Sequence, residues 1–279
     1  MLYYPFLNII GLMTGTSVDG IDISLVRTNG IDLRRLNKNF YYKYSSETKK
    51  NLDDILKTDI NINFKKKRFL DEFITKEHYL ALKDLDIVQN CDLIGFHGQT
   101  IYHNPKKKIS IQLGDPKKLA KLLNKDVIFD FRSDDIAFGG QGAPLAPIYH
   151  KFIIKELKLE LPTCIINIGG VSNLTYWDGN ELIGFDTGPG NALMDDYMLN
   201  IFNKNFDKNG KISSLGTPIK FEIEQFLEHD FFKTNPPKSL DRNEFSFQYN
   251  ELIKKKISVN DTMATLTEFT VETIATSCN

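Results

Sequence analysis

Two glycine-rich stretches of this chain combine the residue types that bind anions. Glycine lets the backbone approach a ligand closely, and serine and threonine hydroxyls add hydrogen-bond donors. Residues Gly15 to Asp22 join both features in a turn between two apolar runs, and Gly169 to Asn173 repeat the combination. Either stretch alone fits an ordinary hairpin turn equally well. Two of them in one chain favour an anion-binding function.

The acidic residues of the first turn extend the chemistry that it can support. Asp19 or Asp22 could orient a magnesium ion or its bound waters. The turn is not a P-loop, which ends in Gly-Lys-Ser or Gly-Lys-Thr, and it is not a dinucleotide fingerprint, because a strand follows it.

Asp186 is the candidate general base. It ends a predicted strand, and Gly188-Pro189-Gly190 then turns the chain into a predicted helix. An aspartate with an ordinary pKa of about 3.9 is ionised at pH 7 and can accept a proton. A helix cap is the competing role, but the density of glycine around Asp186 favours catalysis.

Two further stretches carry polar side chains beside glycines. Arg132 could clamp an anionic group with two hydrogen bonds, and the Gly139 to Gly142 loop could close against a ligand. His97 and His103 could be acid–base groups, although a structural histidine is the more common role for each alone. Their spacing is not that of a metal site.

The composition excludes several classes of function. The 279 residues carry 35 basic and 36 acidic side chains, a net charge of -1, which predicts neither a nucleic-acid nor an anionic-membrane partner. The three cysteines show no disulfide or metal-ligand spacing. No signal peptide or membrane span is recognisable. These features predict a cytoplasmic protein.

The elements that must position these residues alternate between strands and helices. Predicted strands are 8–13, 21–27, 39–44, 92–96, 126–130 (buried), 163–168, 174–177 and 182–185; predicted helices are 49–92 with a break near 61–63, 116–123 capped by Asp115, 146–157, 191–202 and 262–276. Each half of the chain opens with a hairpin. This pattern predicts an α/β protein with two lobes, residues 1–157 and 158–279, and a cleft between them.

With these motifs in order, the chain resembles the anhydro-N-acetylmuramic acid kinases. The matching strings are GLMTGTSVDGID, GFHGQTIYH, IQLGDP, DFRSDDIAFGGQGAPLAP, NIGGVSNL and GFDTGPGNALMD. The resemblance implies the two-lobed actin-like ATPase (ribonuclease H-like) fold. It also implies ATP and Mg²⁺ as cofactors, an amino sugar as substrate and a homodimer. The implied reaction converts 1,6-anhydro-N-acetylmuramic acid, water and ATP into N-acetylmuramic acid 6-phosphate and ADP in peptidoglycan recycling.

The resemblance also assigns roles to individual residues. Asp186 would be the base that activates water. The nucleotide would be held by Gly15, Thr16, Ser17, Val18, Asp19, Gly20, Ile21, Asp22, Gly169, Gly170 and Asn173. The sugar would be bound by His97, Gln99, Arg132, Gly140, Gln141, Gly188 and Asn191. The resemblance assigns no residue as a metal ligand.

The chain departs from the family pattern in two places. The family usually has Pro-Lys-Ser-Thr-Gly-Arg where this chain has Pro237-Lys-Ser-Leu-Asp-Arg242. The family also continues beyond the 262–276 helix, so the second lobe is expected to be incomplete and to leave an exposed sheet edge. Three hypotheses therefore stand: an active kinase on this sugar, a catalytically weak sugar-binding remnant, and a kinase acting on another sugar. Sugar-dependent ADP release separates the first from the second.

Overall fold

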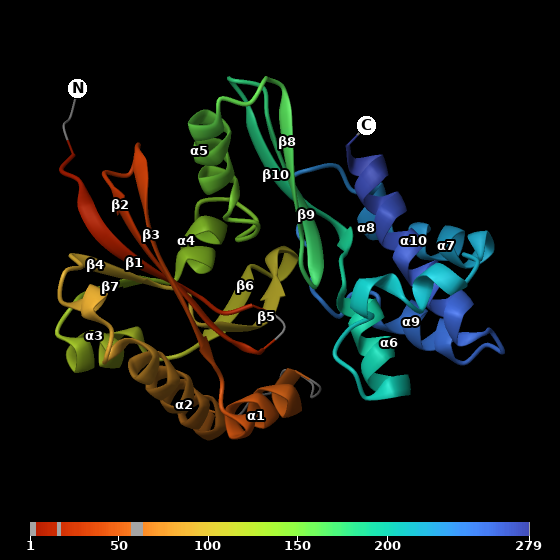
Figure 1. Cartoon of the computed structure of the whole chain (residues 1–279), viewed down its shortest axis with the longest axis horizontal. Coiled ribbons are helices and arrows are strands. Elements are labelled where there is room, and N and C mark those ends of the chain that lie inside the picture. The colour runs from red at the N-terminus through yellow and green to blue at the C-terminus, as the bar shows by residue number, and fades with distance from the viewer. Residues whose placement is uncertain (1–3, 16–17, 57–63, 279) are drawn as a thin grey trace. The chain divides into compact units, whose positions relative to one another are not determined.

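The computed structural model describes residues 4–15, 18–56 and 64–278. The chain divides into two compact units, Met1–Gly139 and Gly140–Asn279 (Figure 1). With η marking 3-10 helices, the elements of the first unit are β1 (Leu7–Met13), β2 (Gly20–Thr28), β3 (Leu33–Lys43), α1 (Ser46–Leu56), α2 (Phe64–Leu82), η1 (Asp86–Val88), β4 (Leu93–Phe96), β5 (Gln99–Asn104), η2 (Pro105–Lys107), β6 (Ile109–Leu113), α3 (Pro116–Leu123), β7 (Asp126–Phe129) and α4 (Phe131–Ala137).

The first unit is built on a five-stranded mixed sheet of order β3-β2-β1-β4-β7. Strands β1, β2 and β3 pair antiparallel, and β4 and β7 continue the sheet parallel to β1. A parallel strand needs a crossover, and helices α1 and α2 supply it between β3 and β4. The α/β class predicted from the sequence is therefore confirmed.

Alternation along β2 explains which face of this sheet is buried. Ile21, Ile23 and Leu25 are at most 6% exposed, whereas Asp22, between two of them, is exposed. The buried side chains share one apolar core with residues of α2 and α3. Apolar packing therefore fixes β2 in register, so that the turn before it is held on a rigid sheet.

Local signals placed most helices and strands correctly. Asp115 caps α3 as predicted, because its Oδ1 accepts a hydrogen bond from the Lys118 amide at 2.9 Å and Pro116 begins the helix.

Strand 126–130 was predicted to be buried, and this was wrong. It forms β7 at the end of the sheet order, and Ile128 and Phe129 are 49% and 38% exposed. The predicted break at 61–63 lies outside the described residues.

The second unit contains a three-stranded antiparallel sheet of order β10-β9-β8. Its elements are α5 (Pro147–Leu157), β8 (Thr163–Ile168), β9 (Val171–Trp177), β10 (Leu182–Pro189), α6 (Ala192–Phe202), η3 (Lys208–Gly210), η4 (Ser213–Leu215), α7 (Lys220–Leu227), α8 (Asp230–Lys233), α9 (Ser246–Ile253) and α10 (Val259–Ser277). Within the described part of this sheet β8 is an edge strand, and Ile166 and Ile168 on it are 41% and 51% exposed.

Helix α5 packs on this sheet. Gly184 of β10 leaves room for it, because a Cβ there would lie 2.2 Å from the Pro147 ring. His150 of α5 shares a hydrogen bond with Thr175 Oγ1 at 2.7 Å. Helix α5, which the sequence analysis placed in the first lobe, therefore lies with the second unit.

Aromatic rings form the core beneath the helices of the second unit. Phe226, Phe245 and Phe269 are fully buried, and the Phe226 and Phe269 ring centroids are 4.7 Å apart. They belong to α7, the α8–α9 connection and α10, so one cluster joins three separate segments.

Among the described helices of the chain, none is both long and apolar enough to cross a membrane.

Acid is expected to destabilise the first unit through His78. Burial lowers the pKa of this fully buried imidazole to about 4, although its hydrogen bond with the Ile74 carbonyl partly offsets the shift. Between about pH 6.5 and 4 the unfolded chain binds a proton here and the folded chain does not, so stability falls as the pH is lowered. The shift predicts a loss of about 3 kcal/mol over this window.

The measurement is urea unfolding from pH 8 to pH 4, with His78→Leu as the matched variant. Leucine does not titrate, so the variant is expected to lose less unfolding free energy below pH 6.5 than the native chain. The difference between the two chains should not change between pH 7 and 8. Parallel curves down to pH 4 would contradict the assignment.

Candidate active site

The glycine turn between β1 and β2 is tied to the motif that follows β4. Thr14 Oγ1 donates to the Gly98 carbonyl at 2.7 Å, and Gln99 Nε2 donates to the Gly15 carbonyl at 3.1 Å. Thr14 and Gln99 are 2% and 0% exposed. Thr14 was not among the predicted site residues, and only its place within the first motif could have indicated it. The two sequence motifs therefore form one local structure.

The rest of this turn is tightly constrained. Val18 has a φ of 55°, which is unusual for a β-branched residue, and its side chain is buried. Gly20 begins β2 against β3, where a Cβ would lie 2.3 Å from the Tyr42 carbonyl oxygen. Ile21 belongs to the sheet core. Thr16 and Ser17 lie outside the described residues.

Two acidic residues flank this turn. Loss of hydration and then the neighbouring Asp19 carboxylate raise the pKa of Asp22. A divalent cation would relieve this repulsion, so the pair fits Mg²⁺ chemically. Within the described ranges, three or more histidine, cysteine, aspartate or glutamate side chains do not gather into a metal site.

Arg132 and His97 contact each other in the first unit. Arg132 Nε donates to His97 Nε2 at 2.9 Å, and His97 Nδ1 is 2.7 Å from the Gly98 carbonyl oxygen. Burial and then the guanidinium lower the pKa of His97 to about 4, so the ring is neutral at pH 7. A neutral imidazole that donates through Nδ1 accepts through Nε2, which matches both contacts. Thus His97 orients the arginine.

The second histidine of this motif has a structural environment. His103 in β5 is 7% exposed, and its Nδ1 is 3.1 Å from Ser110 Oγ on β6. The β5–β6 hairpin was not predicted from the sequence.

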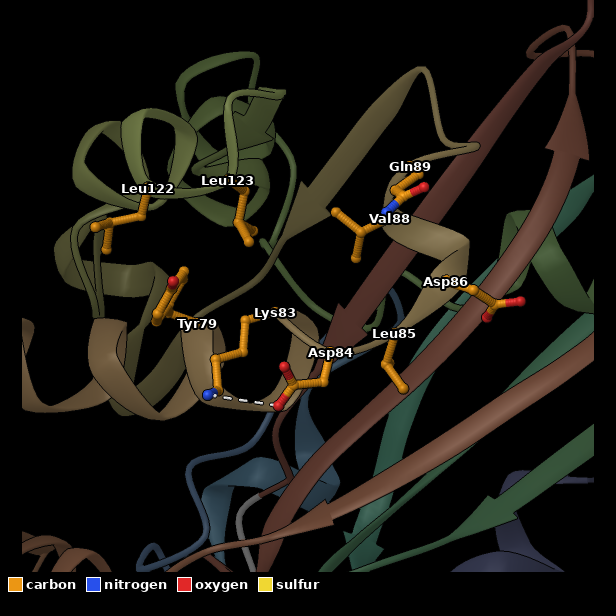
Figure 2. A pocket seen from close by; sticks show the side chains of 9 residues that line it. All are labelled: Tyr79, Lys83, Asp84, Leu85, Asp86, Val88, Gln89, Leu122 and Leu123. Atoms are coloured by element: carbon orange, nitrogen blue, oxygen red, sulfur yellow. Dashed lines mark ion pairs between the residues drawn. The ribbon is translucent and has the colours of Figure 1, made fainter.

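A hollow of about 410 Å³ lies elsewhere in the first unit, between the end of α2, η1 and the end of α3. It is lined by Tyr79, Leu85 and Leu122 among others (Figure 2). None of the predicted site residues lines it.

The second glycine turn packs against the beginning of α6. The Asn191 amide donates to the Gly169 carbonyl at 2.7 Å, and the Gly190 and Ala192 amides donate to the Gly170 carbonyl at 2.9 and 3.2 Å. Gly190 must be small, because a Cβ there would lie 2.1 Å from the Gly169 carbonyl oxygen. The structure therefore brings three predicted residues together: Gly169, Gly170 and Asn191.

Asp186 lies on β10 beside this turn and is 5% exposed. It is paired in register with Asn173 of β9, and the register shifts between Asp186 and Gly188. An irregularity of this kind re-aims the side chains next to it. Gly188, with a φ of 158°, packs against α10, where a Cβ would lie 2.8 Å from Thr273 Oγ1.

The Asp186 carboxylate is also held by a segment that lies outside the predicted site residues. The Leu240 amide donates to Asp186 Oδ2 at 2.7 Å, and the Asp186 amide donates to the Lys238 carbonyl at 2.9 Å. The partial match of residues 237–242 to the family's Pro-Lys-Ser-Thr-Gly-Arg pattern could have indicated this segment. Gly140 and Gln141 open the second unit, and Arg132 lies in the first.

Comparison with protein families decides the identity of the chain. A family model for anhydro-N-acetylmuramic acid kinase matches residues 7–279. The chain belongs to the anhydro-N-acetylmuramic acid kinase family. A family member from Bradyrhizobium diazoefficiens is 40% identical over 281 residues, which cover 96% of this chain and 75% of that protein. One from Rhodopseudomonas palustris strain BisB18 is 41% identical over 283 residues, covering 95% and 75%.

The family membership confirms the resemblance that the motifs indicated. This chain spans about three quarters of the length of these kinases. A solved exopolyphosphatase-like protein aligns with 82% of this chain and 62% of its own, at 13% identity and a TM-score of 0.41. A similarity at that level does not establish a common fold.

Proposed function

We propose that this chain is the kinase that its family name describes, acting on 1,6-anhydro-N-acetylmuramic acid with ATP. Water adds to C1 of the sugar, the bond between C1 and O6 breaks, and O6 takes the γ-phosphoryl group. The products are N-acetylmuramic acid 6-phosphate and ADP. The identity of about 40% over 95% or more of the chain carries this proposal.

Asp186 is the proposed base in this reaction. It accepts a proton from the attacking water, so that hydroxide character develops as the C1–O6 bond opens. Its burial within β10 supports the assignment, because a carboxylate shielded from bulk water can hold a single attacking water in a defined position. The Leu240 amide keeps this buried carboxylate hydrogen-bonded.

The two glycine turns are proposed to hold the nucleotide, and Arg132 the sugar. Phosphoryl transfer depends chiefly on positioning and on stabilisation of charge. Asp19 and Asp22 would hold Mg²⁺, which neutralises phosphate charge when it is bound. His97 supports the sugar role of Arg132, because its neutral ring fixes the guanidinium without competing for an anion.

The proposed fold is the two-lobed actin-like ATPase. Each unit contains three consecutive antiparallel strands with a glycine turn, β1–β3 in the first and β8–β10 in the second. The two parallel strands that follow in the first unit support a ribonuclease H-like lobe. The mixed α/β class is observed.

The test is ADP release by the purified chain with ATP, Mg²⁺ and 1,6-anhydro-N-acetylmuramic acid. N-acetylglucosamine and N-acetylmuramic acid serve as control sugars. In oxygen-18 water the product phosphate should carry no label, because its bridging oxygen is the sugar's O6; hydrolysis of ATP alone would give labelled phosphate. Binding of the sugar without ADP release would favour a catalytically weak sugar-binding remnant. ADP release only with another sugar would favour a kinase that acts on that sugar.

A further inference from the structure

Residues 237–242, here named the clamp loop, run beside strand β10 at Asp186. Two hydrogen bonds join them in opposite directions, one from a main-chain amide to the Asp186 carboxylate and one between main-chain groups. The Leu240 amide donates to Asp186 Oδ2 at 2.7 Å, and the Asp186 amide donates to the Lys238 carbonyl at 2.9 Å. The second bond fixes the distance between strand and loop, so the first reaches the carboxylate from a defined direction.

The clamp loop is itself anchored at three points. Leu240 is 7% exposed and packs in the core of the second unit. Lys238 Nζ lies 4.5 Å from the Phe231 ring centroid and donates to the Phe231 carbonyl at 3.1 Å. Arg242 Nη2 pairs with Asp196 Oδ1 of α6 at 2.7 Å. Because these anchors already restrict the loop, the Leu240 amide loses little further conformational entropy when it donates to the Asp186 carboxylate.

We infer that the clamp loop is a positioning element for the catalytic base, acting through the Leu240 amide. This inference rests on the proposed role of Asp186. The amide restricts rotation of the carboxylate, and it stabilises the ionised form that accepts a proton from water. Catalytic groups held in the reactive geometry before substrate binds contribute to kcat and not to substrate affinity.

A main-chain donor explains how the loop can act despite its unusual sequence. The chain has Leu240 and Asp241 where the family usually has threonine and glycine. The bond to Asp186 needs only the amide of residue 240, so it does not depend on the side chain there. The leucine side chain adds apolar burial that holds the amide in place.

The test removes the Leu240 N–H and keeps the leucine side chain. Leucic acid, inserted at position 240 of the full chain by nonsense suppression, replaces the N–H with an ester oxygen and keeps the side chain. The matched control carries leucine inserted at the same codon. We expect kcat to fall by about 10- to 100-fold, the size of one hydrogen bond to a charged group, with KM for sugar and ATP within about twofold.

A second variant, Lys238→Met, covers the case in which the ester does not fold. It removes one anchor and keeps the amide, so it should lower kcat by about three- to tenfold and leave KM unchanged. Asp186→Asn is measured alongside and is expected to be inactive. With that result, an unchanged kcat in the folded ester, or a raised KM at native kcat, would overturn the positioning role of the clamp loop. Full activity of Asp186→Asn would instead overturn the proposed base.

Discussion

Replacing Asp186 by asparagine is expected to lower kcat by about a thousandfold and to leave the fold intact. Asparagine has nearly the same size, and its side-chain oxygen can still accept the Leu240 amide. The amide group does not accept a proton from water at neutral pH. The loss therefore falls on the chemical step, and KM for both substrates should change little.

Asp178→Asn is the matched control for this substitution. Asp178 lies in the β9–β10 turn, is exposed, and accepts the Asn180 and Glu181 amides. It carries the same chemical change on the same sheet, so kcat should stay near the native value. Both variants are assayed by sugar-dependent ADP release and checked by thermal unfolding. Native turnover in Asp186→Asn would remove the proposed base.

Gly190→Ala is expected to disrupt the junction between the second glycine turn and α6. The new Cβ would lie 2.1 Å from the Gly169 carbonyl oxygen and 3.3 Å from the Ser172 amide nitrogen. Both are main-chain atoms, so no change of side-chain rotamer can relieve the overlap. Moving α6 away would strain three hydrogen bonds between the turn and the helix. The expected loss is about 3 kcal/mol of unfolding free energy or more.

Gly169→Ala is the stability control for Gly190→Ala. A Cβ at Gly169 would meet only the Val171 carbonyl oxygen at 3.6 Å, an ordinary contact. Two glycines of the same junction are therefore expected to respond differently to the same change. Urea unfolding measures both variants against the native chain. Equal loss of stability in the two would show that the junction, and not the close approach at Gly190, sets the effect.

The exposure of β7 and the unit in which α5 lies both depend on distant parts of the chain, and the sequence pattern did not predict them. The apolar run of β7 indicated a buried strand, yet Ile128 and Phe129 are 49% and 38% exposed because β7 is the last strand of its sheet. Position in a sheet depends on which strands pair, and residues 126–129 by themselves do not encode that. Likewise, helix α5 lies with the second unit because Gly184, far along the chain, makes space for Pro147.

Local chemistry is what the sequence determined by itself. The cap at Asp115, the β1–β2 and β9–β10 hairpins and the strand at 163–168 follow from propensities of residues a few positions apart, and the ordered motifs were enough to indicate the family. Only the tertiary structure decided that the Leu240 amide meets Asp186, 54 positions away, and that Arg132 meets His97. Such contacts arise when packing brings remote segments together, and a linear pattern carries no record of that approach.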